Sequence, residues 1–133
     1  MGLYITKDVI NDSVKQIPIS KFYARIENYV IRNNPAYLDL KVRYFISKEI
    51  AEKNDRIPNG KVVPFDGILD LYERTSSNNI VKLTTRFSIP LIKTVDGIEK
   101  YDINIITDIY KQSYDFLKSE MANTIKDIII ENI

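Results

Sequence analysis

Cysteine and histidine are both absent from this chain of 133 residues. Without cysteine the chain has no disulfide, no thiol nucleophile and no thiolate ligand for a metal. Without histidine it lacks the commonest general base and the commonest ligand of transition metals. Any catalytic group would have to be a carboxylate, a lysine or a tyrosine. We therefore predict a protein that is not an enzyme and that holds no cofactor and no metal ion.

Glycine is scarce as well, with four in the chain. No phosphate loop or dinucleotide fingerprint is present, and the nearest approach, Pro58-Asn59-Gly60, is typical of a turn. No apolar run reaches the roughly 18 residues of a transmembrane helix. The first residues also lack the basic and apolar segments of a secretory signal. The sequence thus implies neither a membrane partner nor a small-molecule substrate.

Much of the chain alternates between apolar and polar residues, as β-strands do. Residues 38–46 alternate cleanly, which predicts a strand with one buried face. Residues 21–32 fit a strand or a helix, and the compact Asn-Asn-Pro turn after them favours an antiparallel strand. Two further strand patterns, in residues 67–75 and 80–92, are separated by a turn. Asp96-Gly97 has the sequence of a two-residue hairpin turn.

The two ends of the chain have helical spacing instead. Within residues 6–17, four apolar side chains fall on one side of a helix: Val9, Ile10, Val14 and Ile17. From Thr107 onward, apolar residues recur at steps of three and four, which predicts an amphipathic helix of about 24 residues. The predicted fold is a single α+β domain over residues 1–133. It has an antiparallel sheet of about five strands, a short N-terminal helix and a long C-terminal amphipathic helix.

The last nine residues are rich in isoleucine: Ile125, Ile128, Ile129, Ile130 and Ile133. A helix of the predicted length would overhang a sheet about 24 Å wide, and these isoleucines would form the overhang. Two interpretations are open. The tail either completes the chain's own core or packs on another subunit as a helix or an added strand. We favour the second, because exposed isoleucines would promote aggregation. They then form a partner-binding surface.

Basic and aromatic residues alternate on two predicted strands, on what we expect to be an exposed sheet face: Lys21, Tyr23 and Arg25, and then Lys41, Arg43 and Phe45. Such a face would bind single-stranded nucleic acid through phosphate charge and base stacking. Against this, the net charge of the chain is only +1, and acidic residues lie among the cations. An ordinary polar sheet face is therefore the favoured interpretation, with nucleic acid as the alternative.

Carboxylates and oxygen ligands give weaker signals. Two carboxylate pairs are spaced so that they could act together: Asp66 with Asp70, and Asp102 with Asp108. Glycosidase chemistry needs such carboxyls across a cleft, and nothing in the sequence indicates one. Residues 49–64 are predicted to be a polar loop, and its Asn and Asp residues lack the closing glutamate of a calcium site.

The order of these segments resembles small virion structural proteins of tailed bacteriophages. The resemblance rests on two long strands, KFYARIENYVIRN and AYLDLKVRYFIS, then hairpins, then the helix start ITDIYKQSYDFLKS, within residues 21–119. It implies a non-enzymatic structural protein present in many copies, and it assigns no functional residue. A net charge of +4 on residues 1–62 and −3 on residues 63–133 suits head-to-tail contact between copies.

We therefore expect a structural or assembly protein that acts as a homo-oligomer in a phage particle. A head-to-tail connector or tail ring is preferred over a capsid auxiliary protein. Its expected partners are copies of itself and other structural subunits. Its expected location is the virion, after assembly in the host cytoplasm, and otherwise the cytoplasm.

Overall fold

The computed structural model describes residues 2–32, 36–54, 67–101 and 109–132. The chain divides into two compact units. The first unit comprises residues 1–25, 43–84 and 127–133, and the second comprises residues 26–42 and 85–126. Strands β2 (Ile17–Arg32) and β3 (Tyr37–Phe45) contribute residues to both units. The sequence prediction of a single domain stays a prediction.

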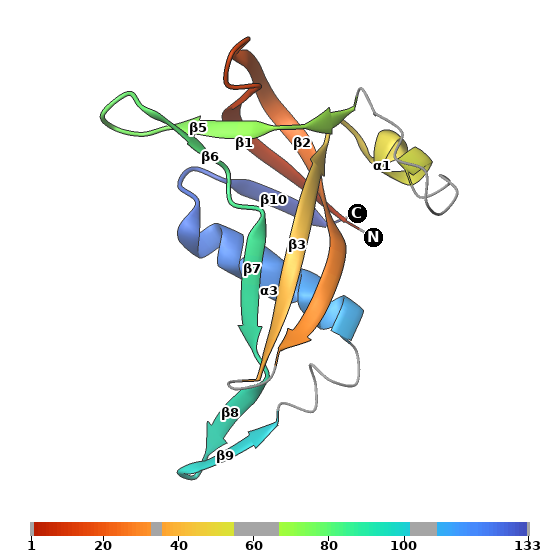
Figure 1. Ribbon diagram of the computed structural model, residues 1–133, viewed down its shortest axis with the longest axis vertical. Coiled ribbons are helices and arrows are strands. Elements are labelled where there is room, and N and C mark those ends of the chain that lie inside the picture. Colours follow the sequence, from red (N-terminus) through yellow and green to blue (C-terminus); the bar gives the residue numbers. More distant parts are fainter. Residues whose placement is uncertain (1, 33–35, 55–66, 102–108, 133) are drawn as a thin grey trace. The chain divides into compact units, whose positions relative to one another are not determined.

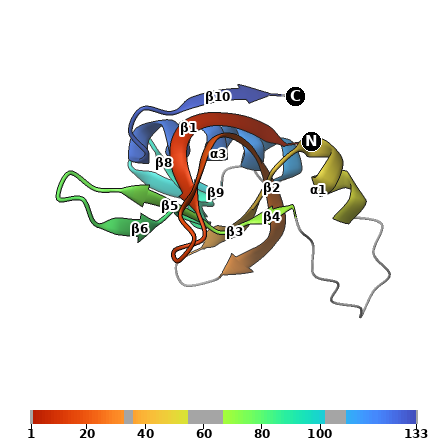
Figure 2. The same ribbon diagram turned by 90° about the horizontal axis from the view of Figure 1, so that it is seen from above.

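The first unit is an antiparallel sheet with one short helix (Figure 1). Its strands hydrogen-bond in the order β4–β3–β2–β1–β5–β6, and β10 also pairs with β1. Figure 2 shows β10 running alongside β1. The remaining elements of this unit are β1 (Leu3–Asn11), α1 (Lys48–Asn54), β4 (Ile68–Leu69), β5 (Leu71–Arg74), β6 (Ile80–Lys82) and β10 (Ile129–Asn132).

Apolar alternation explains this sheet. Leu3 lies opposite Ala24 and Ile5 lies opposite Phe22, and all four side chains are fully buried on one face. On the other face, Tyr23, Phe45 and Ala51 form a second buried cluster. Because Ala51 belongs to α1, this helix covers the cluster.

The predicted N-terminal helix is wrong, because its residues form β1 and the turn into β2. A β-bulge between Thr6 and Val9 shifts the register of β1 against β2, and both Val9 and Ile10 are buried. Two adjacent buried residues break the strand alternation and imitate helical spacing. Beyond the turn, Pro18 of β2 pairs with Ile10 in the sheet.

The turn between β1 and β2 is held by Asp12. Its backbone has a positive φ of 69°, and its carboxylate accepts the backbone N–H groups of Val14 and Lys15. Hydrogen bonds of this kind favour the charged carboxylate, and they lower the pKa of Asp12. Asp and Asn tolerate left-handed geometry, so the turn suits this residue.

The second unit contains the rest of β2 and β3, with β7 (Arg86–Pro90), the hairpin β8 (Ile92–Val95) and β9 (Ile98–Tyr101), and helix α3 (Ile109–Thr124). Leu40 lies opposite Phe87 and Leu38 opposite Ile89, and all four are buried. Helix α3 contacts β7 and buries Tyr114, Leu117 and Met121. The hairpin turn at Asp96-Gly97 is confirmed, since both residues have positive φ, at 52° and 77°.

The predicted long C-terminal helix is also wrong. Helix α3 has 16 residues and ends at Thr124, and β10 follows. Asp127, in the turn between α3 and β10, takes a positive φ of 54°. Consecutive isoleucines then favour the extended chain, because β-branched side chains pack well on a pleated surface.

The fold is therefore mostly antiparallel β rather than α+β. In the described residues an eight-stranded sheet takes the place of the predicted sheet of about five strands, and β8 and β9 form a separate two-stranded sheet. The strand predictions for residues 21–32 and 38–46 are confirmed by β2 and β3. The turn between β5 and β6 is confirmed as well, with a hydrogen bond from Asn78 N–H to the Thr75 carbonyl. Within the described ranges, no helix is both long enough and apolar enough to pass through a lipid bilayer.

Candidate functional site

The C-terminal isoleucines differ in exposure. Ile125 is buried directly after α3, whereas Ile128 and Ile130 are half-buried. Ile129 is 61% exposed. Ile133 lies outside the described residues.

The register of β10 explains these differences. Ile130 lies opposite Ile5, which is fully buried, and Ile129 lies opposite Thr6, which is exposed. Because side chains alternate between the two faces of a strand, Ile130 points to the buried face and Ile129 away from it. The tail is therefore an added strand on its own chain. Binding of a partner by the tail stays a prediction, and Ile129 is the isoleucine most exposed for it.

The two aromatic residues of the predicted nucleic-acid face are buried rather than exposed. Tyr23 and Phe45 are each 2% exposed and pack with Ala51 of α1. The Tyr23 ring meets the Tyr4 ring edge-on, at 5.1 Å between centroids. A covered ring offers no surface for base stacking, so the expected platform is not present in this arrangement.

The four basic residues of that prediction all have partners. Lys21 lies over the Tyr4 ring, at 5.2 Å from its centroid. Arg25 donates a hydrogen bond to the Ala51 carbonyl. Lys41, in the second unit, forms an ion pair with Glu27 at 3.4 Å. Arg43 is half-buried and also makes an interaction.

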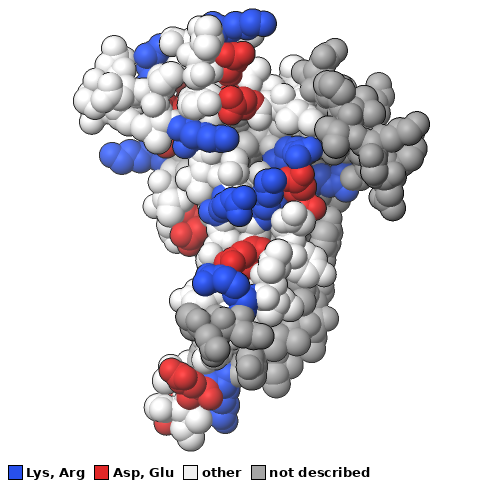
Figure 3. Space-filling view, viewed as in Figure 1, with Lys and Arg blue, Asp and Glu red and all other residues white. Residues whose placement is uncertain are grey.

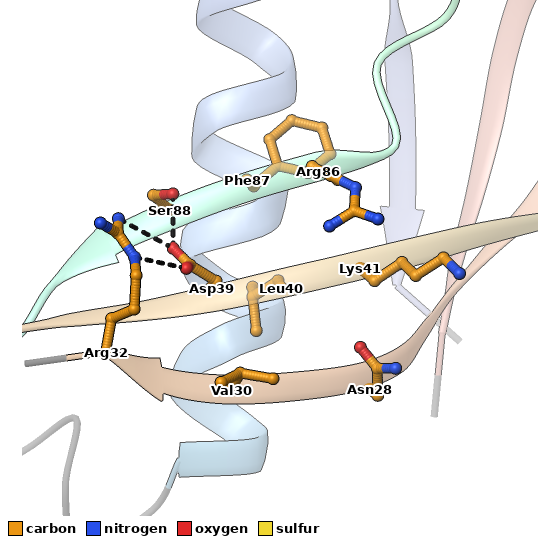
Figure 4. Close-up of a pocket in the computed structure, with 9 residues that line it drawn as sticks. All are labelled: Asn28, Val30, Arg32, Asp39, Leu40, Lys41, Arg86, Phe87 and Ser88. Carbon is orange, nitrogen blue, oxygen red and sulfur yellow. Dashed lines mark hydrogen bonds and ion pairs between the residues drawn. The ribbon is translucent and has the colours of Figure 1, made fainter.

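A cavity of about 420 Å³ lies on the second unit, against strands β2, β3 and β7 (Figure 4). Asp39 stands in its lining. The Arg32 guanidinium contacts one carboxylate oxygen of Asp39 at 2.6 Å, and the Ser88 hydroxyl donates to the other at 2.7 Å. The hydrogen bond from Arg32, and then that from Ser88, hold the pKa of Asp39 below its usual value. The charge of Arg86 lowers this pKa further.

The charges around this cavity are mixed. Lys41 and Arg86 lie directly opposite each other on β3 and β7, an arrangement that is unfavourable for like charges. Glu27 offsets the charge of Lys41, and the Asp39 carboxylate lies near Arg86. Figure 3 likewise shows basic and acidic side chains next to one another over β3 and β7. The surface is not the continuous basic patch that nucleic-acid backbones favour.

Most of the carboxylate and metal candidates fall outside the described residues: Asp55, Asn59, Gly60, Asp66, Asp102 and Asp108. The polar loop of residues 49–64 does so in large part, and its described beginning is helix α1. Asp70 accepts a hydrogen bond from the Tyr72 hydroxyl at 3.0 Å. That bond raises the pKa of Tyr72. In the portion of the chain that is described, no three acidic side chains gather as metal ligands.

Sequence reasoning missed the most exposed apolar stretch within a described strand. Tyr29, Val30 and Ile31 of β2 are 48%, 58% and 53% exposed. Their own sequence gave a weak signal, because three consecutive apolar residues fit a buried strand as well as an exposed edge. Only the pairing of the neighbouring strands distinguishes the two.

That pairing leaves one side of the stretch open. Strand β2 hydrogen-bonds to β3 and to β1, and its pairing with β1 ends at Ala24. Two residues further along β2, the N–H of Ile26 donates to the Tyr114 hydroxyl of α3 at 3.0 Å. Beyond Ile26, no described strand pairs with the side of β2 that faces away from β3. We call residues 27–32 the β2 edge.

Comparison with known proteins gives no match for this chain among family models, curated proteins or solved structures.

Proposed function

We propose that this chain is a non-enzymatic assembly protein that works as a homo-oligomer. The observation that carries the proposal is the apolar surface on the β2 edge and on β10, which each have one side unpaired among the described strands. Tyr29, Val30 and Ile31 occupy the β2 edge, and Ile129 is exposed on β10. Open strands with apolar side chains invite pairing with another chain, and proteins that stay monomeric normally protect such edges.

We further propose a phage virion as the setting, with a head-to-tail connector or tail ring preferred and a capsid auxiliary protein second. This part rests on the order of strands and helix quoted from residues 21–119. Repeated copies of one small chain build closed rings when each copy presents complementary surfaces to its neighbours. Other structural subunits of the particle are then its further partners.

The test is the mass of the protein in solution. Light scattering coupled to gel filtration should give a multiple of 15.5 kDa at high micromolar concentration, and the mass should fall on dilution. Addition of a single-stranded oligonucleotide at low salt should leave the mass unchanged, because the rings of Tyr23 and Phe45 are buried. A monomer at every concentration would contradict assembly, and a complex with the oligonucleotide would favour the nucleic-acid alternative.

A further inference from the structure

Strands β2 and β7 are the outer strands in the β2–β3–β7 part of the second unit. Strand β7 is protected against pairing with a further strand, whereas the centre of the β2 edge is not. Strand β7 exposes Arg86 and ends in Pro90. Charged side chains and proline discourage pairing with a further strand, since proline has no N–H to donate. The β2 edge carries no proline, and its charged residues, Glu27 and Arg32, stand at its two ends around an apolar centre.

We propose that the β2 edge binds the same edge of a second copy of this chain, in an antiparallel pair centred on Val30. This inference rests on the proposed function and names one surface through which the copies associate. A two-fold pair closes a dimer, so a ring would need a second contact surface as well. The two copies would form a continuous arrangement of strands in the order β7–β3–β2–β2–β3–β7. The partner is thus a strand of identical sequence, held by backbone hydrogen bonds and side-chain pairs.

Symmetry restricts the register of such a pair. Paired residues in an antiparallel ladder lie on the same face of the sheet, so a two-fold axis must pass where a residue faces its own copy. With the axis at Val30, the two Val30 side chains meet. Tyr29 of each copy then lies opposite Ile31 of the other, and Asn28 lies opposite Arg32. Every exposed apolar side chain of the edge obtains an apolar partner.

The neighbouring registers are poorer. With the axis at Tyr29, Val30 would lie opposite Asn28, and Ile31 would lie opposite the charged Glu27. With the axis at Ile31, Val30 would lie opposite an arginine. Aromatic and β-branched residues stabilise a sheet when they face one another across strands. The order Tyr-Val-Ile is therefore self-complementary about its central residue.

The flanking charges fit the same register. Arg32 is held by Asp39 in its own chain and its guanidinium lies 5.2 Å from the Tyr37 ring centroid, so it does not bring an unpaired charge to the apolar centre. Asn28 opposite Arg32 is a polar pair that can exchange hydrogen bonds. The edge is thus polar at its end and apolar at its centre, as protein interfaces are at their rim and core.

A lysine at the axis tests the surface. Val30→Lys would place two ammonium groups opposite each other, and it should raise the Kd of self-association by about tenfold or more. Val81→Lys is the matched control, because Val81 is 49% exposed on the short strand β6. It should leave the Kd unchanged. Both positions are exposed, so circular dichroism should show folded protein for both variants.

Single cysteines test the register. The chain has no cysteine, so each variant carries one thiol. Under mild oxidation Val30→Cys should form a disulfide dimer, because facing residues of antiparallel strands lie within disulfide reach. Val81→Cys should crosslink much more slowly. Tyr29→Cys and Ile31→Cys should each crosslink weakly alone and strongly when the two proteins are mixed, since each faces the other across the axis.

The outcomes separate this inference from the proposed function. Fast crosslinking of Val30→Cys together with crosslinking of the mixed pair supports the β2 edge and its register. If wild-type protein is oligomeric while Val30→Cys crosslinks no faster than Val81→Cys, the copies meet elsewhere and the inference is overturned. If wild-type protein is monomeric at every concentration, the proposed function fails as well.

Discussion

Two adjacent isoleucines in β10 should respond very differently to the same substitution. Ile130 is half-buried opposite the fully buried Ile5, and Ile129 is 61% exposed opposite Thr6. Threonine keeps the β-branched shape that strands favour and removes apolar volume. Ile130→Thr and Ile129→Thr therefore make the same side-chain change in the same strand. The first changes the buried face of β10 and the second changes the exposed face.

The expected magnitudes follow from burial. Complete burial of an isoleucine side chain contributes about 1.5–3 kcal/mol to stability. Because Ile130 is half-buried, Ile130→Thr should lower the unfolding free energy of the protein by about 1–1.5 kcal/mol. Ile129→Thr should stay within about 0.5 kcal/mol of wild type, as exposed substitutions do. With a urea m value of about 1–3 kcal/mol/M, the larger loss lowers the urea midpoint by about 0.3–1.5 M.

Urea denaturation followed by circular dichroism measures both midpoints. All three proteins should be compared at one protein concentration, because self-association raises apparent stability. Equal midpoints for the two variants, or a larger loss at Ile129, would show that β10 does not pair with β1 in this register.

Three further predictions concern other contacts. Deletion of residues 127–133 removes β10 and exposes an edge of β1, and should lower the unfolding free energy by several kcal/mol. An unchanged urea midpoint would show that the tail adds nothing to its own fold. Tyr114→Phe leaves the buried N–H of Ile26 without an acceptor and should cost about 1–3 kcal/mol in the same assay. A loss much below that range would contradict the hydrogen bond. The pKa of Asp39 is lowered in the folded protein, so its stabilising effect is present above the unfolded pKa and is lost as pH falls through the folded value. The difference in Tm between wild type and Asp39→Asn should therefore shrink below about pH 4, and a constant difference would contradict the pairing with Arg32.

Local patterns in the sequence were sufficient wherever neighbouring residues decide the structure. Leu38, Leu40 and Val42 alternate with polar residues, and β3 buries all three. Asp96-Gly97 determines its hairpin turn because both positions need positive φ. These features depend on two to nine consecutive residues, so no distant contact was needed to predict them.

Features that depend on distant residues could not be predicted in this way. The bulge in β1 is defined only by its register with β2, and without it Val9 and Ile10 have helical spacing. Tyr23 and Phe45 alternate with cations as an exposed face would, and the covering residue Ala51 comes from a helix elsewhere in the chain. A sequence gives no indication of what lies above a strand face.

The candidate site shows the same division. The apolar character of the C-terminal isoleucines was evident in the sequence, whereas their split between two faces required the register with β1. The β2 edge was predicted as a strand, but its openness depends on where β1 stops pairing, at Ala24. Whether a strand edge is exposed depends on whether another strand pairs with it. The spacing of apolar residues within one strand carries no information on that pairing.

Sedimentation equilibrium of wild-type protein beside Val30→Lys tests the central claim, self-association through a sheet edge, most directly. We expect the wild-type mass to rise with concentration to at least twice 15.5 kDa. The mass of Val30→Lys should stay close to that of one chain over the same range, with an unchanged circular dichroism spectrum. A wild-type mass of 15.5 kDa at every concentration would contradict assembly, and equal masses for two associating proteins would contradict the β2 edge.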